Sequence, residues 1–198
     1  VCEGYEIDNV LAVKSSAGAT ADQTFAYYAT GNVANATDAS NAVASMNSFQ
    51  NHGVIVFALD NDNKRDEAHL YAALPELYDS LKEAWITAIN IDVKGNAGSE
   101  TYTRRSGQCG STAKYCLGAD GYGIATANYS NSYSLPYGST GLTDGGDPVY
   151  FPNHGSSWVA PQISGAIAIL AQAFPNQSPE IWTDRLLASA DNDWFSHD

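Results

Sequence analysis

A short stretch of serines and small residues late in the chain has the residue types that nucleophilic catalysis needs. Ser157 stands at the start of an apolar run rich in small residues, with Gly155 before it and Pro161 after it. A nucleophilic serine benefits from a helix N-terminus, where backbone N–H groups and the helix dipole favour developing negative charge. Gly155 would let a substrate backbone approach closely. A structural interpretation is also open at this point, namely a buried glycine- and alanine-rich helix capped by Ser156 or Ser157.

The composition limits the class of protein. The 198 residues suffice for one domain with a full hydrophobic core. The formal net charge of −13 argues against binding nucleic acid or an anionic membrane through a basic surface. No apolar run approaches the roughly 18 residues of a membrane-spanning helix, so we expect no membrane contact by this segment. No signal peptide is visible, and Val1 opens as if residues had preceded it. These features fit a soluble, secreted or surface protein.

The three cysteines point to a local disulfide rather than to a metal site. Cys109 and Cys116 close a short loop, which favours a bond between them in an oxidising compartment. No Cys-x-x-Cys pair and no histidine pair accompanies them, so we expect no metal. Cys2 is left over, either free or paired outside this chain.

The order of the elements predicts an α/β domain with a mostly parallel sheet. Alternating or continuous apolar residues predict strands, whereas apolar residues three or four positions apart, together with capping residues, predict helices. The segment Ser15–Asn35 carries little information, and Asn128–Asp147 is predicted to be a loop. The expected strands are Tyr5–Val13, Val54–Leu59 (buried on both faces), Trp85–Val93, Tyr115–Leu117 and Gly123–Ala127, and the expected helices are Asp38–Asn51, Ser157–Phe174 (buried in the core) and one from Ser178 to about Ala190.

The serine stretch resembles the serine motif of subtilisin-like proteases, Gly-Thr-Ser-x-x-x-Pro followed by a small-residue helix. Here the motif reads Gly155-Ser-Ser-Trp-Val-Ala-Pro161, with Ser156 in place of the usual threonine. The resemblance implies that Ser157 is the nucleophile. It also implies the fold, a subtilisin-like parallel β-sheet sandwiched by helices, of which residues 1–198 would be the C-terminal portion.

The same resemblance suggests an oxyanion site and substrate contacts. In this family a strand like Val54–Leu59 leads into a Gly-Asn pair, and Asn61 takes the place of that asparagine, with Asp60 replacing the glycine. A neutral amide donor aimed at the tetrahedral intermediate is worth roughly 10²–10³ in rate. The alternative is that this segment is only a solvated turn. Four residues are expected to line the substrate site: Ser16, Gly18, Asp60 and Gly155.

Two further segments look most like the subtilisin-like autotransporter proteases of Gram-negative bacteria. These segments are Leu59–Leu77, which includes Tyr71-Ala-Ala-Leu-Pro75, and Cys109–Gly118, in which the two cysteines enclose Thr112-Ala113. The likeness implies a Cys109–Cys116 disulfide. It also implies a secreted protein or one displayed at the outer membrane of a Gram-negative bacterium.

The motifs that would carry the triad aspartate and histidine of a subtilisin-like protease are absent. His52 falls after a helix, His154 lies too near Ser157 in the chain, and His69 and His197 have the polar surroundings of surface residues. We therefore expect the Asp and His to come from upstream sequence, so that the chain alone is inactive. Two alternatives stay open: a catalytically inactive subtilase-like binding or structural module, and a wrong family assignment.

The expected activity is that of a serine endopeptidase with no cofactor. Its partners would be a protein or peptide substrate and the upstream part of the same peptidase domain. The acidic segment 60–67 is dense in the oxygen donors that a calcium loop needs. The segment does not match the calcium-loop pattern, because Lys64 interrupts the ligand spacing and no glycine makes the sharp turn.

Overall fold

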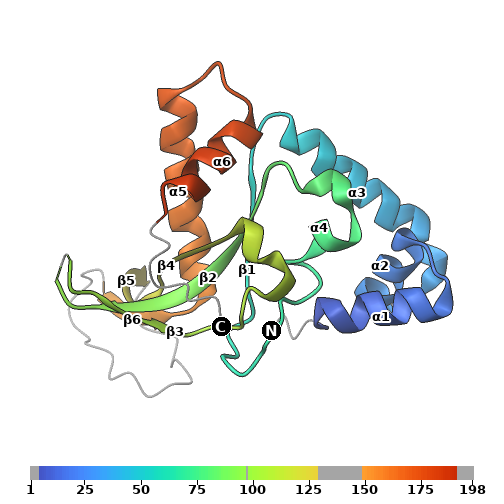
Figure 1. The fold of residues 1–198 in the computed structure, drawn as a ribbon, viewed down its shortest axis with the longest axis horizontal. Coiled ribbons are helices and arrows are strands. Elements are labelled where there is room, and N and C mark those ends of the chain that lie inside the picture. Colours follow the sequence, from blue (N-terminus) through green and yellow to red (C-terminus); the bar gives the residue numbers. More distant parts are fainter. Residues whose placement is uncertain (1–4, 97, 129–148, 191–198) are drawn as a thin grey trace.

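A central strand separates two hydrophobic cores in the computed structural model, which describes residues 5–96, 98–128 and 149–190. The expected α/β class is confirmed, because helices flank a mixed sheet on both faces (Figure 1). Strand β2 (Trp85–Lys94) turns Trp85 and Ile89 toward one core and Ile86 and Ala88 toward the other. This alternation follows from the two-residue period of a strand.

The sheet is built around β2. Strands β1 (Ile55–Ala58) and β4 (Cys116–Asp120) pair with it in parallel, whereas β3 (Thr101–Arg104) pairs with it antiparallel. Strands β5 (Tyr122–Asn128) and β6 (Val149–His154) form a separate antiparallel pair. The strands expected over Val54–Leu59 and Trp85–Val93 are confirmed. Strand β1 is half-buried along its length, however, and not enclosed on both faces as predicted, because among the described strands only β2 pairs with it.

The N-terminal segment is helical, so the strand predicted over Tyr5–Val13 is wrong. Helix α1 (Ile7–Ala17) buries Ile7 and Val10, which lie three residues apart on one helical face. The segment Ser15–Asn35 contains α2 (Ala21–Thr30), whose first turn has a capping box between Thr20 and Gln23. The remaining helices on this side are the 3₁₀ turn η1 (Val33–Asn35), α3 (Ala36–Gln50, expected over Asp38–Asn51), α4 (Leu74–Leu77) and the 3₁₀ turn η2 (Asp79–Leu81).

Helix α5 (Ser156–Ala173) covers the other face of the sheet together with α6 (Pro179–Ala188). Both helices were expected, and Ser178 caps α6 as predicted, since its hydroxyl accepts from the Ile181 N–H. The prediction that α5 is buried throughout is wrong. Only one stripe, with Val159, Ile163 and Ile167, is buried, whereas Ile169 is 69% exposed. An apolar face of α5 is thus left without cover in the described structure.

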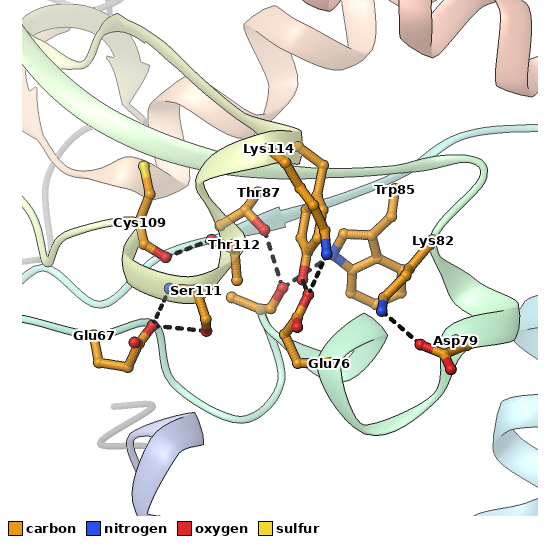
Figure 2. Close-up of polar contacts among 12 residues, drawn as sticks. Glu67, Glu76, Asp79, Lys82, Trp85, Thr87, Cys109, Ser111, Thr112 and Lys114 are labelled. Carbon is orange, nitrogen blue, oxygen red and sulfur yellow. Dashed lines mark hydrogen bonds and ion pairs between the residues drawn. The ribbon is translucent and has the colours of Figure 1, made fainter. Parts of the chain in front are cut away.

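The loop between Cys109 and Cys116 forms a 3₁₀ turn, η3 (Gly110–Tyr115), closed by a disulfide. Glu67 holds this turn, because its carboxylate accepts hydrogen bonds from the Ser111 N–H (2.8 Å) and hydroxyl (3.0 Å) (Figure 2). A side chain at Gly110 (φ 49°) would overlap that carboxylate, which explains the glycine.

A second carboxylate fixes the end of the same turn. Glu76 of α4 accepts from the buried Tyr115 hydroxyl at 3.0 Å and pairs with Lys114 at 3.2 Å (Figure 2). Burial and the Glu76 carboxylate raise the pKa of Tyr115 well above its ordinary value, so this hydroxyl remains a hydrogen-bond donor. The disulfide turn is thereby tied to α4, and the beginning of β4 is held against β2.

Two parts of the sequence lie outside the structural account. The predicted loop Asn128–Asp147 falls outside the described residues except for Asn128, and so do Cys2 and His197. Along the described ranges, no helix combines the length and apolar character that crossing a membrane requires.

We predict that the disulfide can be detected chemically and contributes to stability. Peptide mapping without reduction should recover the Cys109 and Cys116 peptides as one linked species. Replacing both cysteines by serine should lower the free energy of unfolding by about 2 kcal/mol, as expected for closing a short loop. The control is Cys2→Ser, which should change neither result. Free thiols at both positions would contradict the prediction.

Candidate functional site

The first turn of α5 presents Ser157 at the molecular surface. Gly155 is the N-cap, and its φ of 147° is a conformation that side chains rarely adopt. The Ser157 side chain is exposed, and no hydrogen bond from another described residue engages its hydroxyl. Its backbone N–H is among the first four of the helix, which have no partner within the helix. The hydroxyl and the N–H are therefore both accessible to a ligand.

Ser156 holds this turn against the end of β1. Its side chain is fully buried, with the hydroxyl 2.5 Å from the Leu59 carbonyl and 3.0 Å from Oδ1 of Asn61. The Ser156 N–H also donates to Asn61 Oδ1, at 2.9 Å. These bonds join residues almost a hundred positions apart. The role of Ser156 as an anchor was not predicted beyond its place in the motif.

Asn61 lies beside the turn with its amide NH₂ unused. Its Oδ1 accepts from Ser156, and the amide is so close to Gly155 that a Cβ there would lie 3.1 Å from Oδ1 and 3.3 Å from Nδ2. Nδ2 has no partner among the described residues. The structure thus places Asn61 against Gly155 and Ser156, in the turn that leads into Ser157. The arrangement provides two free N–H donors, Nδ2 of Asn61 and the backbone of Ser157, at one helix N-terminus.

Gly121 supports the opposite side of the turn. The Gly155 N–H donates to the Gly121 carbonyl at 2.9 Å, and the Gly121 N–H donates to Ile91 of β2 at 3.2 Å. A Cβ at residue 121 would lie 2.6 Å from Asn90 Oδ1 and 2.7 Å from both the Gly155 carbonyl oxygen and Val159. Sequence reasoning missed Gly121, because only the fold reveals how closely these backbones approach.

The carboxylate and the backbone carbonyl of Asp60 both accept hydrogen bonds from backbone N–H groups. Its Oδ1 accepts from the Asp62 N–H at 2.8 Å, and its carbonyl accepts from the Gly107 N–H at 2.8 Å. Asp62 in turn accepts from the Lys64 N–H at 3.0 Å. The segment is a turn of the kind that Asp and Asn favour, and Asp60 remains adjacent to Asn61. Over the described residues, no cluster of three or more His, Cys, Asp and Glu side chains is arranged to hold a metal ion.

Ser16 and Gly18 are not brought to Ser157. Ser16 lies in the last turn of α1, where its hydroxyl donates to the Val13 carbonyl, and Gly18 is the left-handed cap that ends the helix. Helix α1 lies at the opposite side of the molecule from the start of α5 (Figure 1). The expected substrate contact of these two residues has no support from their position.

The described histidines do not bond to Ser157. His52 is exposed after α3. His154 accepts the Gly123 N–H at Nδ1 (2.8 Å), and its ring stacks on Tyr122 with centroids 4.2 Å apart. His69, predicted to be a surface residue, is buried with 3% exposure. The prediction failed because the polar neighbours of His69 in sequence did not reveal the Ala58 carbonyl, which lies 3.1 Å from Nε2. Burial outweighs that hydrogen bond and lowers the pKa of His69.

Residues 8–197 match the Subtilase family (Peptidase S8). The chain is 25% identical over 147 residues to "Serotype-specific antigen 1" of Mannheimia haemolytica. The matched region covers 74% of this chain and 14% of that protein. It is also 25% identical over 154 residues to "Extracellular serine protease" of Serratia marcescens, covering 73% of this chain and 14% of that protein. The chain therefore spans only a small part of the curated relatives it matches.

Solved structures with a similar fold include that of a protease. "Prenylagaramide maturation protease PagA" superposes with a TM-score of 0.51 at 19% identity, covering 78% of this chain and 46% of that one. At this identity the likeness concerns the fold alone.

We predict that Gly121 is essential to the packing of the turn. In Gly121→Ala the new methyl group meets backbone and Val159 at distances that real contacts do not reach, so the free energy of unfolding should fall by about 1–3 kcal/mol. The control is Gly165→Ala in α5, where a Cβ meets nothing within 4 Å. This substitution should raise the free energy of unfolding by about 1 kcal/mol. Urea unfolding measures both, and equal effects of the two substitutions would refute the packing argument.

We also predict that His69 makes folding sensitive to acid. Because its folded pKa is depressed, the unfolded chain takes up the proton first, and stability present above the ordinary value of 6.5 should be lost as the pH falls below it. His69→Gln should reduce this loss between pH 7 and pH 5, whereas His52→Gln should leave it unchanged. An identical acid response in wild type and His69→Gln would show that burial of His69 has no such effect.

Proposed function

Since the chain belongs to the subtilase family, we propose that it is the nucleophile-bearing part of a serine endopeptidase, the C-terminal portion of the catalytic domain over residues 1–198. The observation that carries the proposal is the contact between Asn61 and the Gly155–Ser156 turn. This contact leaves an amide donor, unpaired within the described part of the chain, next to an exposed serine at a helix N-terminus. The name of the Serratia relative, an extracellular serine protease, supports the same activity.

Ser157 attacks the carbonyl carbon of the scissile peptide bond through Oγ and forms a tetrahedral intermediate. Its collapse breaks the C–N bond, the leaving amine takes the proton that the histidine received from Ser157, and water then hydrolyses the acyl-enzyme that remains. The negative charge of the tetrahedral intermediate forms on the former carbonyl oxygen. This oxygen accepts hydrogen bonds from the Ser157 N–H and from Asn61 Nδ2, with the positive end of α5 adding to their effect. Asn61 is pre-oriented for this role because Ser156 already binds its Oδ1.

The aspartate and histidine that activate Ser157 come from sequence upstream of this chain, and the chain alone does not hydrolyse peptides. Two features support a missing packing partner: β1 pairs with only one strand among those described, and the outer face of α5 exposes Ile169 and small residues. Upstream strands and helices of the same domain would cover both surfaces. The proton of Ser157 then passes to the upstream histidine during attack.

The substrate is a protein or peptide that approaches Ser157 at the exposed start of α5. Gly155 is buried, and its missing side chain leaves room for Asn61. Asp60, next to Asn61, remains a proposed substrate contact. The protein acts outside the cell or at its surface, and we assign it to the autotransporter branch. The Cys109–Cys116 bond, which requires an oxidising compartment, and the names of the two curated relatives support this location.

We predict that Asn61 contributes to catalysis through its NH₂ group and to structure through its oxygen. In the protein with its upstream sequence, Asn61→Asp retains the acceptor for Ser156 but loses the donor. Peptide hydrolysis should then show kcat lower by roughly 10²–10³ or more with KM nearly unchanged, because the lost bond forms mainly in the transition state and the new carboxylate repels the developing oxyanion.

Two further variants separate catalysis from structure. Asn61→Ala should lower kcat similarly and also lower the melting temperature, since Ser156 loses its partner. The control is Asn63→Ala, an exposed change in the same turn, which should alter neither value. If Asn61→Asp keeps the wild-type kcat, Asn61 is only a structural anchor.

A further inference from the structure

A buried amide with an unsatisfied oxygen lies beneath the serine turn. Asn90 of β2 is only 1% exposed, and its Oδ1 has no hydrogen-bond partner among the described residues. Its backbone is held on both sides, because its N–H donates to the Ser106 hydroxyl at 3.0 Å and its carbonyl accepts from the Arg105 N–H at 2.8 Å. A buried polar group without a partner is costly, and its presence calls for a physical reason.

The position of Asn90 links it to the turn that carries Ser157. Alternation along β2 puts its side chain on the face covered by α5, with Ile86 and Ala88. Its Oδ1 and the Gly155 carbonyl oxygen border the same space, since a Cβ at Gly121 would lie 2.6 Å from one and 2.7 Å from the other. Gly155 is the N-cap of the helix that begins with Ser156 and Ser157.

We propose that Asn90 is a positioning residue for the nucleophile, whose amide NH₂ donates to the Gly155 carbonyl. A half-turn of the amide group exchanges oxygen and nitrogen without changing the packing, because the two ends have nearly the same shape. After this half-turn, the NH₂ group of Asn90 takes the place of the unsatisfied Oδ1 and faces the Gly155 carbonyl oxygen, which can accept a hydrogen bond from it. The Gly155 carbonyl already accepts from the Trp158 N–H at 3.0 Å and has a second lone pair for this bond.

This role completes a three-point support of the turn. Asn61 holds Ser156 from the side of β1, the Gly121 carbonyl holds the Gly155 N–H, and Asn90 holds the Gly155 carbonyl from below. Ser157 follows directly after these fixed groups. A small displacement of the nucleophile strongly reduces the rate of its reaction. A residue that fixes the Gly155–Ser156 peptide group, just before Ser157, therefore affects kcat without touching substrate. The inference rests on the proposed function, since it assigns a role in the reaction of Ser157.

The test compares Asn90→Leu with wild type in the protein that includes its upstream sequence. Leucine has the branched shape of asparagine but no polar atoms, so removal of a purely structural, unsatisfied amide leaves the melting temperature equal or higher. We expect kcat for peptide hydrolysis to fall roughly ten-fold or more with KM unchanged. Asn90→Ala, which avoids overpacking, is expected to lower kcat in the same way.

Two control variants distinguish positioning from general stability. Thr87→Val on the same strand removes a buried hydroxyl that donates to the Ala72 carbonyl, and should lower the melting temperature but keep kcat. Asn47→Leu removes another amide with a buried unpaired oxygen, on α3, and should also keep kcat. Wild-type kcat in folded Asn90→Leu and Asn90→Ala overturns the positioning role alone. A folded wild-type protein that does not hydrolyse peptides overturns the proposed function, and this inference with it.

Discussion

The buried hydrogen bonds of Ser156 are the interaction on which the site depends. Its hydroxyl and N–H connect the start of α5 to the Leu59 carbonyl and the Asn61 amide at the end of β1. Without this connection, two segments that are far apart in the chain would have no fixed relation. Because the oxygen of Asn61 is occupied by Ser156, its NH₂ group stays available. The same contact that orders the turn therefore also orients a donor, and stability and chemistry are coupled here.

The sheet makes this connection possible. Strand β2 is shared by both cores, and its neighbours β1 and β4 end where the site begins, as expected for parallel strands whose carboxyl ends meet at one edge. Gly121, just after β4, contacts the serine turn, and Asn61 follows β1. The disulfide turn held by Glu67 and Glu76 fixes the beginning of β4 (Figure 2). The acidic side chains far from Ser157 thus contribute to the rigidity of the strand that supports it.

Much of this arrangement could be predicted from sequence where the signal is local. The apolar runs of β1 and β2, the cap of α6 and the serine motif each lie within a few adjacent residues. Helix α1 was mistaken for a strand because Ile7, Leu11 and Val13 fit a two-residue period, although Ile7, Val10 and Val13 have the three-residue spacing of a helix. The burial of His69 and the contacts of Ser156, Gly121 and Asn90 depend on partners distant in sequence, and no single-sequence pattern reports them. The exposed side of α5 was predicted to be buried, because its composition suits a core that the described residues do not complete.

The most direct measurement of the central claim is labelling with a fluorophosphonate probe, which reacts only with an activated serine. The protein with its upstream sequence, the chain alone, and Ser157→Ala in the former would be treated side by side and the labelled peptide mapped by mass spectrometry. The account predicts a single adduct on Ser157 in the first sample, and none in the other two. A well-folded protein with upstream sequence that takes no label, or takes it at another serine, would contradict the account.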